Sequence, residues 1–128
     1  MGEDASWPSG RLVLGMVHLQ PLPGTPFYRG AGVEQILATA VESARALRDG
    51  GAGGCLVQTV DRVYAPGEDA DPARIAALSL IVRAVVEATG PRFEVGVQVM
   101  RTAVRASLAV AKVAGARSCA SARWWGPR

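Results

Sequence analysis

The sequence has few of the residues that mark several classes of protein. Its two cysteines, Cys55 and Cys119, lie far apart and lack metal-ligand spacing, so free thiols in a reducing, cytoplasmic setting are the simplest interpretation. One histidine and scattered carboxylates form no recognisable metal-ligand set. No apolar run approaches the roughly 18 residues of a transmembrane helix. Residues 1–11 contain acidic side chains and no apolar signal core, and we interpret them as a flexible leader.

Charge of one sign is also not concentrated anywhere in the chain. The net charge of +3 comes from 14 basic and 11 acidic residues, and no run of five or six like charges occurs. Because nucleic-acid-binding proteins gather basic residues on one surface, we do not expect a nucleic-acid partner. A hydrophobic content of 49% over 128 residues is enough for one domain with a core.

What is present is a repeated alternation of short apolar strands and amphipathic helices. We expect strands over 12–19, 54–60 and 94–100, each followed by a helix over 32–49, 71–89 and 102–114. Asp71-Pro72 has the residues typical of a helix start, and Gly115 is a typical helix stop. Apolar residues on both faces of 12–19 predict a sheet that is covered on both sides. This order predicts parallel βαβ units. The helix positions expected to be buried are Val33, Ile36, Leu37, Ala40, Val41, Ala44, Leu47, Ile75, Leu78, Val82, Val85, Val104, Leu108 and Ala111.

Residues 118–128 do not continue this pattern. A fourth strand is due after Arg117, but the segment has no strand alternation, and the adjacent Trp124 and Trp125 would point to opposite faces of a sheet. One interpretation is a frayed tail. The other is a shifted reading frame, because one added T before a Ser118 codon of the TCN type converts the segment into a strand-like run. We therefore treat 118–128 as an anomalous tail.

The segment Gly15-Met-Val-His-Leu-Gln-Pro-Leu-Pro-Gly-Thr-Pro-Phe-Tyr28 resembles the opening signature of the BtpA/SgcQ family. The resemblance continues through 50–57, 71–77 and 96–101 to Arg117. It implies a TIM-type (β/α)8 barrel of the ribulose-phosphate-binding kind. The chain would supply its first three βα units over 12–117, as a truncated barrel. A whole barrel needs about 250 residues.

The resemblance carries two functional interpretations. In the first, the intact protein is a cytoplasmic barrel acting on a small metabolite, and the analogy of fold suggests a phosphorylated one. In the second, it is an assembly factor working through protein contacts, since the family is named for a factor in photosystem I biogenesis. Enzymatic activity stays open in this comparison, and no cofactor is assigned. We expect the 128-residue chain to be inactive, and to self-associate through unpaired sheet edges.

The candidate site residues follow the expected strands, at the edge where barrel enzymes hold their chemistry. As catalytic groups we predict His18, a proton carrier, and Asp61; the alternatives are a structural histidine and a carboxylate that satisfies loop backbone groups. As substrate-binding groups we predict Gln58, Arg62 and Arg101, with loop contacts or surface ion pairs as the alternatives. The family usually has Glu-Asn where this chain has Gln58-Thr59, and its Asn after the third strand is Thr102 here. Glutamine cannot act as a general base.

Overall fold

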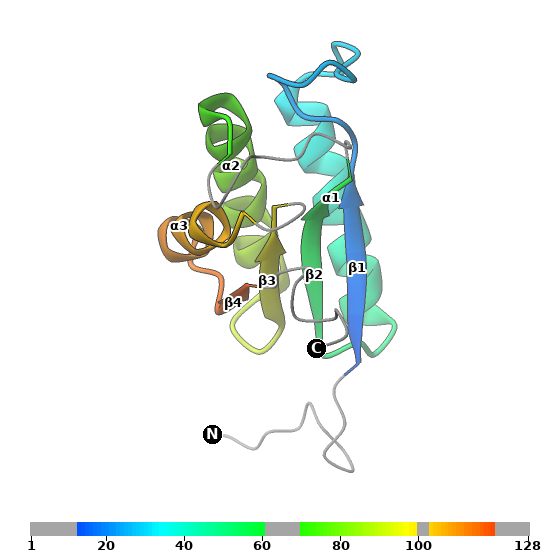
Figure 1. The fold of residues 1–128 in the computed structure, drawn as a ribbon. Helices are drawn as coiled ribbons and strands as arrows, with labels where there is room; N and C mark the ends of the chain where they lie inside the picture. Colours follow the sequence, from blue (N-terminus) through cyan, green and yellow to red (C-terminus); the bar gives the residue numbers. More distant parts are fainter. Residues whose placement is uncertain (1–12, 61–69, 100–102, 120–128) are drawn as a thin grey trace, which may run out of the picture.

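The computed structural model describes residues 13–60, 70–99 and 103–119 of the chain. Strands and helices alternate along it, and each strand but the last is followed by a helix (Figure 1). The elements are β1 (Leu14–Leu19), α1 (Val33–Asp49), β2 (Gly54–Thr59), α2 (Pro72–Thr89), β3 (Glu94–Gln98), α3 (Val104–Ala114) and β4 (Ser118–Cys119). The three βα units predicted from the sequence are therefore confirmed, with bounds shifted by a few residues.

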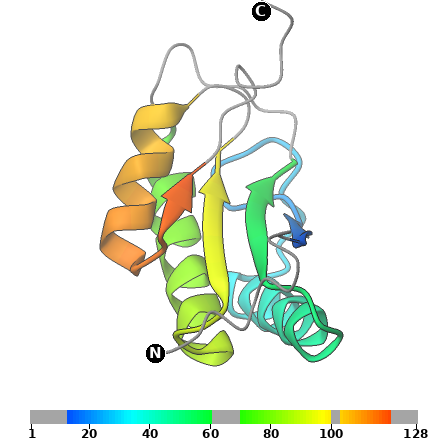
Figure 2. The ribbon, with the colours of Figure 1, turned by 90° about the horizontal axis from the view of Figure 1, so that it is seen from below.

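The strands form one parallel sheet in the order β1-β2-β3-β4. Consecutive parallel strands require a connection that returns across the sheet, and here helices make those connections. The helices gather along one side of the sheet (Figure 2). Sequential parallel strands with helices on one side are the arrangement of a barrel wall, so the fold is consistent with part of a (β/α)8 barrel.

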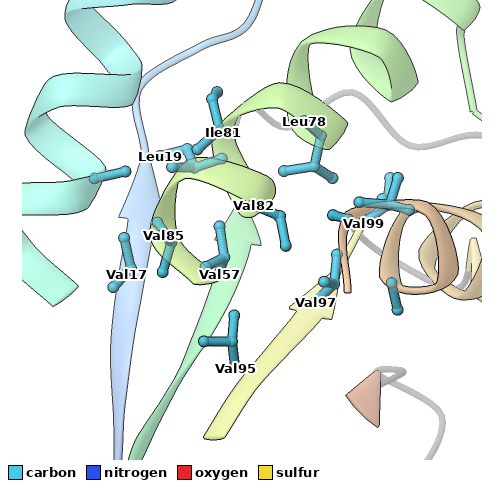
Figure 3. Packing of buried hydrophobic residues seen from close by; sticks show 14 of the residues in the cluster. Val17, Leu19, Val57, Leu78, Ile81, Val82, Val85, Val95, Val97 and Val99 are labelled. Atoms are coloured by element: carbon cyan, nitrogen blue, oxygen red, sulfur yellow. The ribbon is translucent and has the colours of Figure 1, made fainter. Parts of the chain in front are cut away.

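The core lies between the sheet and the helices. Val17, Val57 and Val97 are neighbours in the strand register, so their side chains share one face of the sheet. Figure 3 shows this face packed against Val82 and Val85 of α2, and all five side chains are at most 3% exposed. Burial of these branched side chains supplies the main stabilisation of the sheet–helix contact.

The other face of the sheet is not covered by any helix of the described residues. Leu14 and Met16 of β1 point to this side and are 47% and 45% exposed. Within the described residues, the expectation of a covered sheet is therefore confirmed for the helix face and stays a prediction for the other face. We call this surface the open face. Its members, taken from the strand register, are Leu14, Met16, His18, Gly54, Leu56, Gln58, Glu94, Gly96, Gln98 and Ser118.

The buried stripe of α3 differs from the prediction. Leu108 is 54% exposed, whereas Ala106, Val110 and Ala114 are at most 2% exposed and face the core. The small alanine side chains let the helix approach the sheet closely, and this fixes which positions turn inward. In α1 and α2 the expected positions Ile36, Ala40, Ala44, Leu78, Val82 and Val85 are buried. The remaining expected positions, Val33, Leu37, Val41, Leu47 and Ile75, are partly buried and pack against the core.

A fourth strand is present where the sequence showed no strand pattern. Ser118 and Cys119 pair with Gly96 and Val97 of β3, so the first two residues of the expected tail belong to the sheet. The preceding Arg117 donates its backbone N–H to Val95, a distance of 3.1 Å, and this bond guides the chain into register. The tryptophans and the rest of the segment after Cys119, like the expected leader, lie outside the described residues.

Candidate functional site

Three polar side chains form a row across the open face where β1, β2 and β3 end. His18 pairs in register with Gln58, and Gln58 pairs with Gln98. Paired residues of neighbouring strands point to the same side and lie about 5 Å apart. We call His18, Gln58 and Gln98 the polar row. The sheet therefore brings two of the predicted site residues together and adds a third.

The two glutamines of the polar row are directly hydrogen-bonded. Nε2 of Gln58 donates to Oε1 of Gln98 at 2.5 Å. Gln98 is only 5% exposed, whereas Gln58 is half-buried. Because its oxygen is already used, Gln98 offers Nε2 as a donor, and this atom makes no hydrogen bond within the described parts of the chain. The hydrogen bond from Gln58 thus fixes the orientation of the Gln98 side-chain amide at the carboxyl ends of β2 and β3.

His18 is the exposed member of the polar row. It is also the only titratable side chain in that row, because both its neighbours are neutral amides. An imidazole can serve as a general acid or base, and exposure leaves this one accessible to a ligand. The structure places His18 near the carboxyl end of β1, and its role as a site residue stays a prediction.

A buried arginine lies beneath the end of β2. Arg74 is in the first turn of α2 and is 1% exposed, and its guanidinium donates to the hydroxyl of Thr59 over 3.4 Å. Asp71 caps the same helix and accepts from the backbone N–H of Arg74 at 3.3 Å. A buried guanidinium needs such polar neighbours, because its desolvation is costly. Arg74 therefore anchors the start of α2 to the strand that carries Gln58.

The proline-rich segment after β1 is a packed loop. Leu22 is fully buried, and the hydroxyl of Thr25 donates to its carbonyl at 2.9 Å. Gly24 has a φ of 93°, and a Cβ there would lie 2.4 Å from Oδ2 of Asp71. The loop therefore lies directly on the start of α2, and only glycine fits at this contact. This agrees with a scaffolding role for Pro21, Pro23 and Gly24.

The same loop also starts α1. Gly32, at the N-cap position, has no side chain, and its backbone N–H donates to the hydroxyl of Tyr28 at 2.9 Å. The hydroxyl of Tyr28 therefore satisfies the backbone N–H of the N-cap residue, which makes no other hydrogen bond with the described residues at the start of α1. The loop that follows β1 is therefore held at the starts of both α1 and α2.

Cys55 is a buried strand residue and not an exposed nucleophile. It is 0% exposed on β2, and burial raises the pKa of its thiol from 9.0 to about 11. A thiol with so high a pKa is almost entirely protonated at neutral pH and reacts slowly. Cys55 therefore contributes to the packing of β2 and is not suited to act as a nucleophile.

Three predicted site residues, Asp61, Arg62 and Arg101, lie outside the described residues. Their roles stay predictions. Within the described ranges, no three histidine, cysteine or acidic side chains lie close enough to hold a metal ion. In the same part of the chain, no helix has the length and hydropathy needed to cross a bilayer.

Two residues near this edge were not predicted. Gln98 follows Glu94 and Gly96 in strict alternation with valines, so the period of two already assigned it to the face opposite the valines. Arg74 has no comparable signal, because an arginine in the first turn of a helix is usually solvated. Its burial depends on the loop after β1, which the sequence alone does not place.

Comparison with known proteins agrees with the fold and with the opening signature. A model of the BtpA family matches residues 9–120. The chain is 33% identical over 106 residues to the photosystem I biogenesis protein BtpA of Synechocystis sp., covering 82% of this chain and 36% of that protein. It is 30% identical over 107 residues to an uncharacterized protein of Archaeoglobus fulgidus, covering 83% of this chain and 41% of that one.

The chain thus spans about two fifths or less of the length of these relatives. No solved structure matches it significantly. The family model covers most of the chain, including every strand and helix that the structure describes. The chain belongs to the BtpA family.

Proposed function

We propose that the chain supplies part of a small-molecule site in a cytoplasmic BtpA-family barrel, with the polar row as its wall. The observation that carries this proposal is the register of His18, Gln58 and Gln98 on the open face, at the carboxyl ends of three parallel strands. In barrel enzymes this end of the sheet holds the active site, because the loops that follow the strands surround it.

The chemistry of the row favours a polar, hydrogen-bonding ligand. His18 would transfer a proton, and Nε2 of Gln98 would donate to a hydroxyl or carbonyl oxygen of the ligand. Asp61 is a second proposed catalytic group, and Arg62 and Arg101 would bind a phosphate or carboxylate. A phosphorylated metabolite is therefore the ligand class that we propose.

Gln58 limits the reactions open to this site. An amide does not accept a proton near neutral pH, so Gln58 would orient a ligand and would not act as a base. Its bond to Gln98 supports this positioning role, because it fixes the orientation of both amides. Proton transfer in the polar row would then depend on His18.

Isothermal titration of the chain with ribose 5-phosphate, and with inorganic phosphate in parallel, tests the proposal. Gln98→Leu should weaken binding of the sugar phosphate about three- to tenfold, the worth of one neutral hydrogen bond. Gln35→Leu, on the exposed side of α1, should leave binding unchanged. The same loss in both variants, or no saturable binding by the unsubstituted chain, would refute the proposed site.

The alternative function is that of an assembly factor. One observation favours it: Leu80, Leu108 and Val113 are 60%, 54% and 75% exposed on α2 and α3, on the side turned away from the sheet. The Synechocystis relative is named for photosystem I biogenesis, which is an assembly process. In this case substitutions on α2 and α3 would abolish function in a full-length relative, and His18→Gln would not.

We also propose that the chain alone has no turnover and binds no nucleic acid. Its basic residues are spread over the described surface, and three of them, Arg48, Arg83 and Arg117, already pair with acidic side chains. Turnover by the isolated chain would refute the first part. Tight, salt-dependent DNA or RNA binding would refute the second.

A further inference from the structure

A buried serine near the start of α3 joins that helix to the end of β3. Ser107 is 0% exposed, and its side-chain oxygen makes two hydrogen bonds. It accepts from the backbone N–H of Val99 at 2.9 Å and donates to the carbonyl of Ala103 at 2.8 Å. A hydroxyl has one hydrogen, so the bond to Ala103 fixes its direction and leaves a lone pair for Val99. One side chain therefore contacts both the end of β3 and the start of α3.

The N–H that Ser107 binds belongs to the peptide unit directly after Gln98. Val99 follows the last residue of β3 and is only 2% exposed, so its N–H depends on an acceptor inside the protein. Because a peptide unit is planar, the bond to Ser107 also fixes the plane in which the backbone leaves Gln98. The preferred directions of a side chain depend on its own backbone conformation. The bond at Val99 therefore restricts the Gln98 side chain.

A similar contact is present at the end of β2. Thr59 directly follows Gln58, and its hydroxyl accepts from the buried Arg74 near the start of α2. Thr59 and Val99 alternate with the two glutamines, so both contacts lie on the helix side of the sheet, opposite the polar row. The hydrogen bond between Gln58 and Gln98 thus joins two strand ends that are each held from the helix side.

We propose that Ser107 is a positioning residue for the polar row, whose hydroxyl sets the orientation of the Gln98 amide from the helix side of the sheet. Small size alone does not explain a serine here, because three other buried positions of α3 are alanines, Ala106, Ala111 and Ala114. An alanine would fill the position but would make neither hydrogen bond. A donor that is already oriented loses less freedom when a ligand binds. This consequence for a ligand rests on the proposed function, whereas the orientation of Gln98 does not.

Side-chain amide NMR of the chain without ligand tests the positioning role. In Ser107→Ala the Nε2 signals of Gln58 and Gln98 should move, because the backbone beside Gln98 is no longer held. The matched control is Ser79→Ala in α2, which removes the same kind of bond, from a serine hydroxyl to the carbonyl four residues earlier, at 2.8 Å. Unmoved glutamine signals in Ser107→Ala, or equal movement in both variants, would overturn the proposal.

Hydrogen exchange needs no substitution and decides the question even where Ser107→Ala does not fold. In the unsubstituted chain the amide of Val99 should exchange as slowly as the amides within β3, although Val99 lies beyond the strand. The reason is its bond to a hydroxyl that water does not reach. Exchange of the Val99 amide at the rate of an unprotected amide would overturn the proposal.

Titration with ribose 5-phosphate tests the step from Gln98 to a ligand. Ser107→Ala should weaken binding about threefold. The double variant of Ser107→Ala and Gln98→Leu should bind no more weakly than Gln98→Leu alone, because Ser107 acts only through Gln98. Losses that multiply would overturn the positioning role. If the unsubstituted chain shows no saturable binding, the proposed small-molecule site fails, and the signals of Gln98 in the chain without ligand still decide the role of Ser107.

Discussion

The hydrogen bond between Gln58 and Gln98 leads to the most detailed prediction. Gln98→Leu removes the acceptor of a neutral hydrogen bond and leaves the half-buried Gln58 amide near water, so it should cost about 1 kcal/mol of stability. Gln58→Leu should cost more, about 1–3 kcal/mol, because it leaves the oxygen of the 5% exposed Gln98 without its donor. The double variant replaces both partners with apolar side chains and should cost less than the sum.

Urea unfolding followed by circular dichroism, at one fixed protein concentration, measures these differences. The cycle should give an interaction energy of about 1 kcal/mol, with an unchanged dependence on urea. Gln35→Leu on the exposed side of α1 controls for the general effect of the substitution. Additivity of the two single variants within about 0.3 kcal/mol would show that the bond does not couple the strand ends.

Four further predictions concern the scaffold and the two cysteines. Gly54→Ala should lower the free energy of unfolding by about 2 kcal/mol more than Gly15→Ala does. The methyl group added at Gly54 would lie 2.4 Å from the backbone oxygen of Glu94 in β3, whereas the one added at Gly15 would meet only the flexible side chain of Leu47. Thermal unfolding of both variants measures this difference. Asp71→Ala should lower stability by about 1 kcal/mol through loss of the N-cap, and Asp71→Asn should retain most of it, as urea unfolding would show. The pKa of Cys55 is about 11 in the folded chain and lies above the ordinary 9.0, so the contribution of Cys55 to stability should be constant below pH 9 and fall between pH 9 and 11. Urea unfolding across this range should show a steeper fall for the unsubstituted chain than for Cys55→Ala. A thiol reagent should also label Cys119 in the native chain well before Cys55, and equal rates would contradict the burial of Cys55.

Much of the fold could be predicted from local patterns in the sequence. Helix starts and stops at Asp71 and Gly115 have direct chemical signals, and the structure uses both as expected. The buried stripe of α3 was less predictable, because its inward positions are mostly alanines and the large Leu108 points outward. When small residues form the contact, hydrophobicity no longer identifies the buried side of a helix.

The fourth strand shows a second limit of pattern reading. Ser118 and Cys119 have no strand-like alternation, yet they pair with β3 because Arg117 is already fixed beside it. Its side chain also forms an ion pair with Glu94 at 2.9 Å. Here neighbouring elements impose a conformation that local propensity does not specify.

The candidate site could be predicted only in part. His18 and Gln58 were identified because each ends a strand, which is a feature of the sequence alone. Gln98 and Arg74 depend on relations between strands and loops that are distant in the sequence. Register decides which polar side chains meet, and register is set by the packing of the whole sheet.

Side-chain amide NMR during titration with ribose 5-phosphate tests the central proposal most directly. We expect the Nε2 signals of Gln58 and Gln98 and the ring signals of His18 to shift together and to saturate at one ligand concentration. The Gln35 amide, on α1, should not move. Saturable shifts confined to other residues, with the three polar-row side chains unchanged, would contradict the proposal that this row is the wall of the binding site.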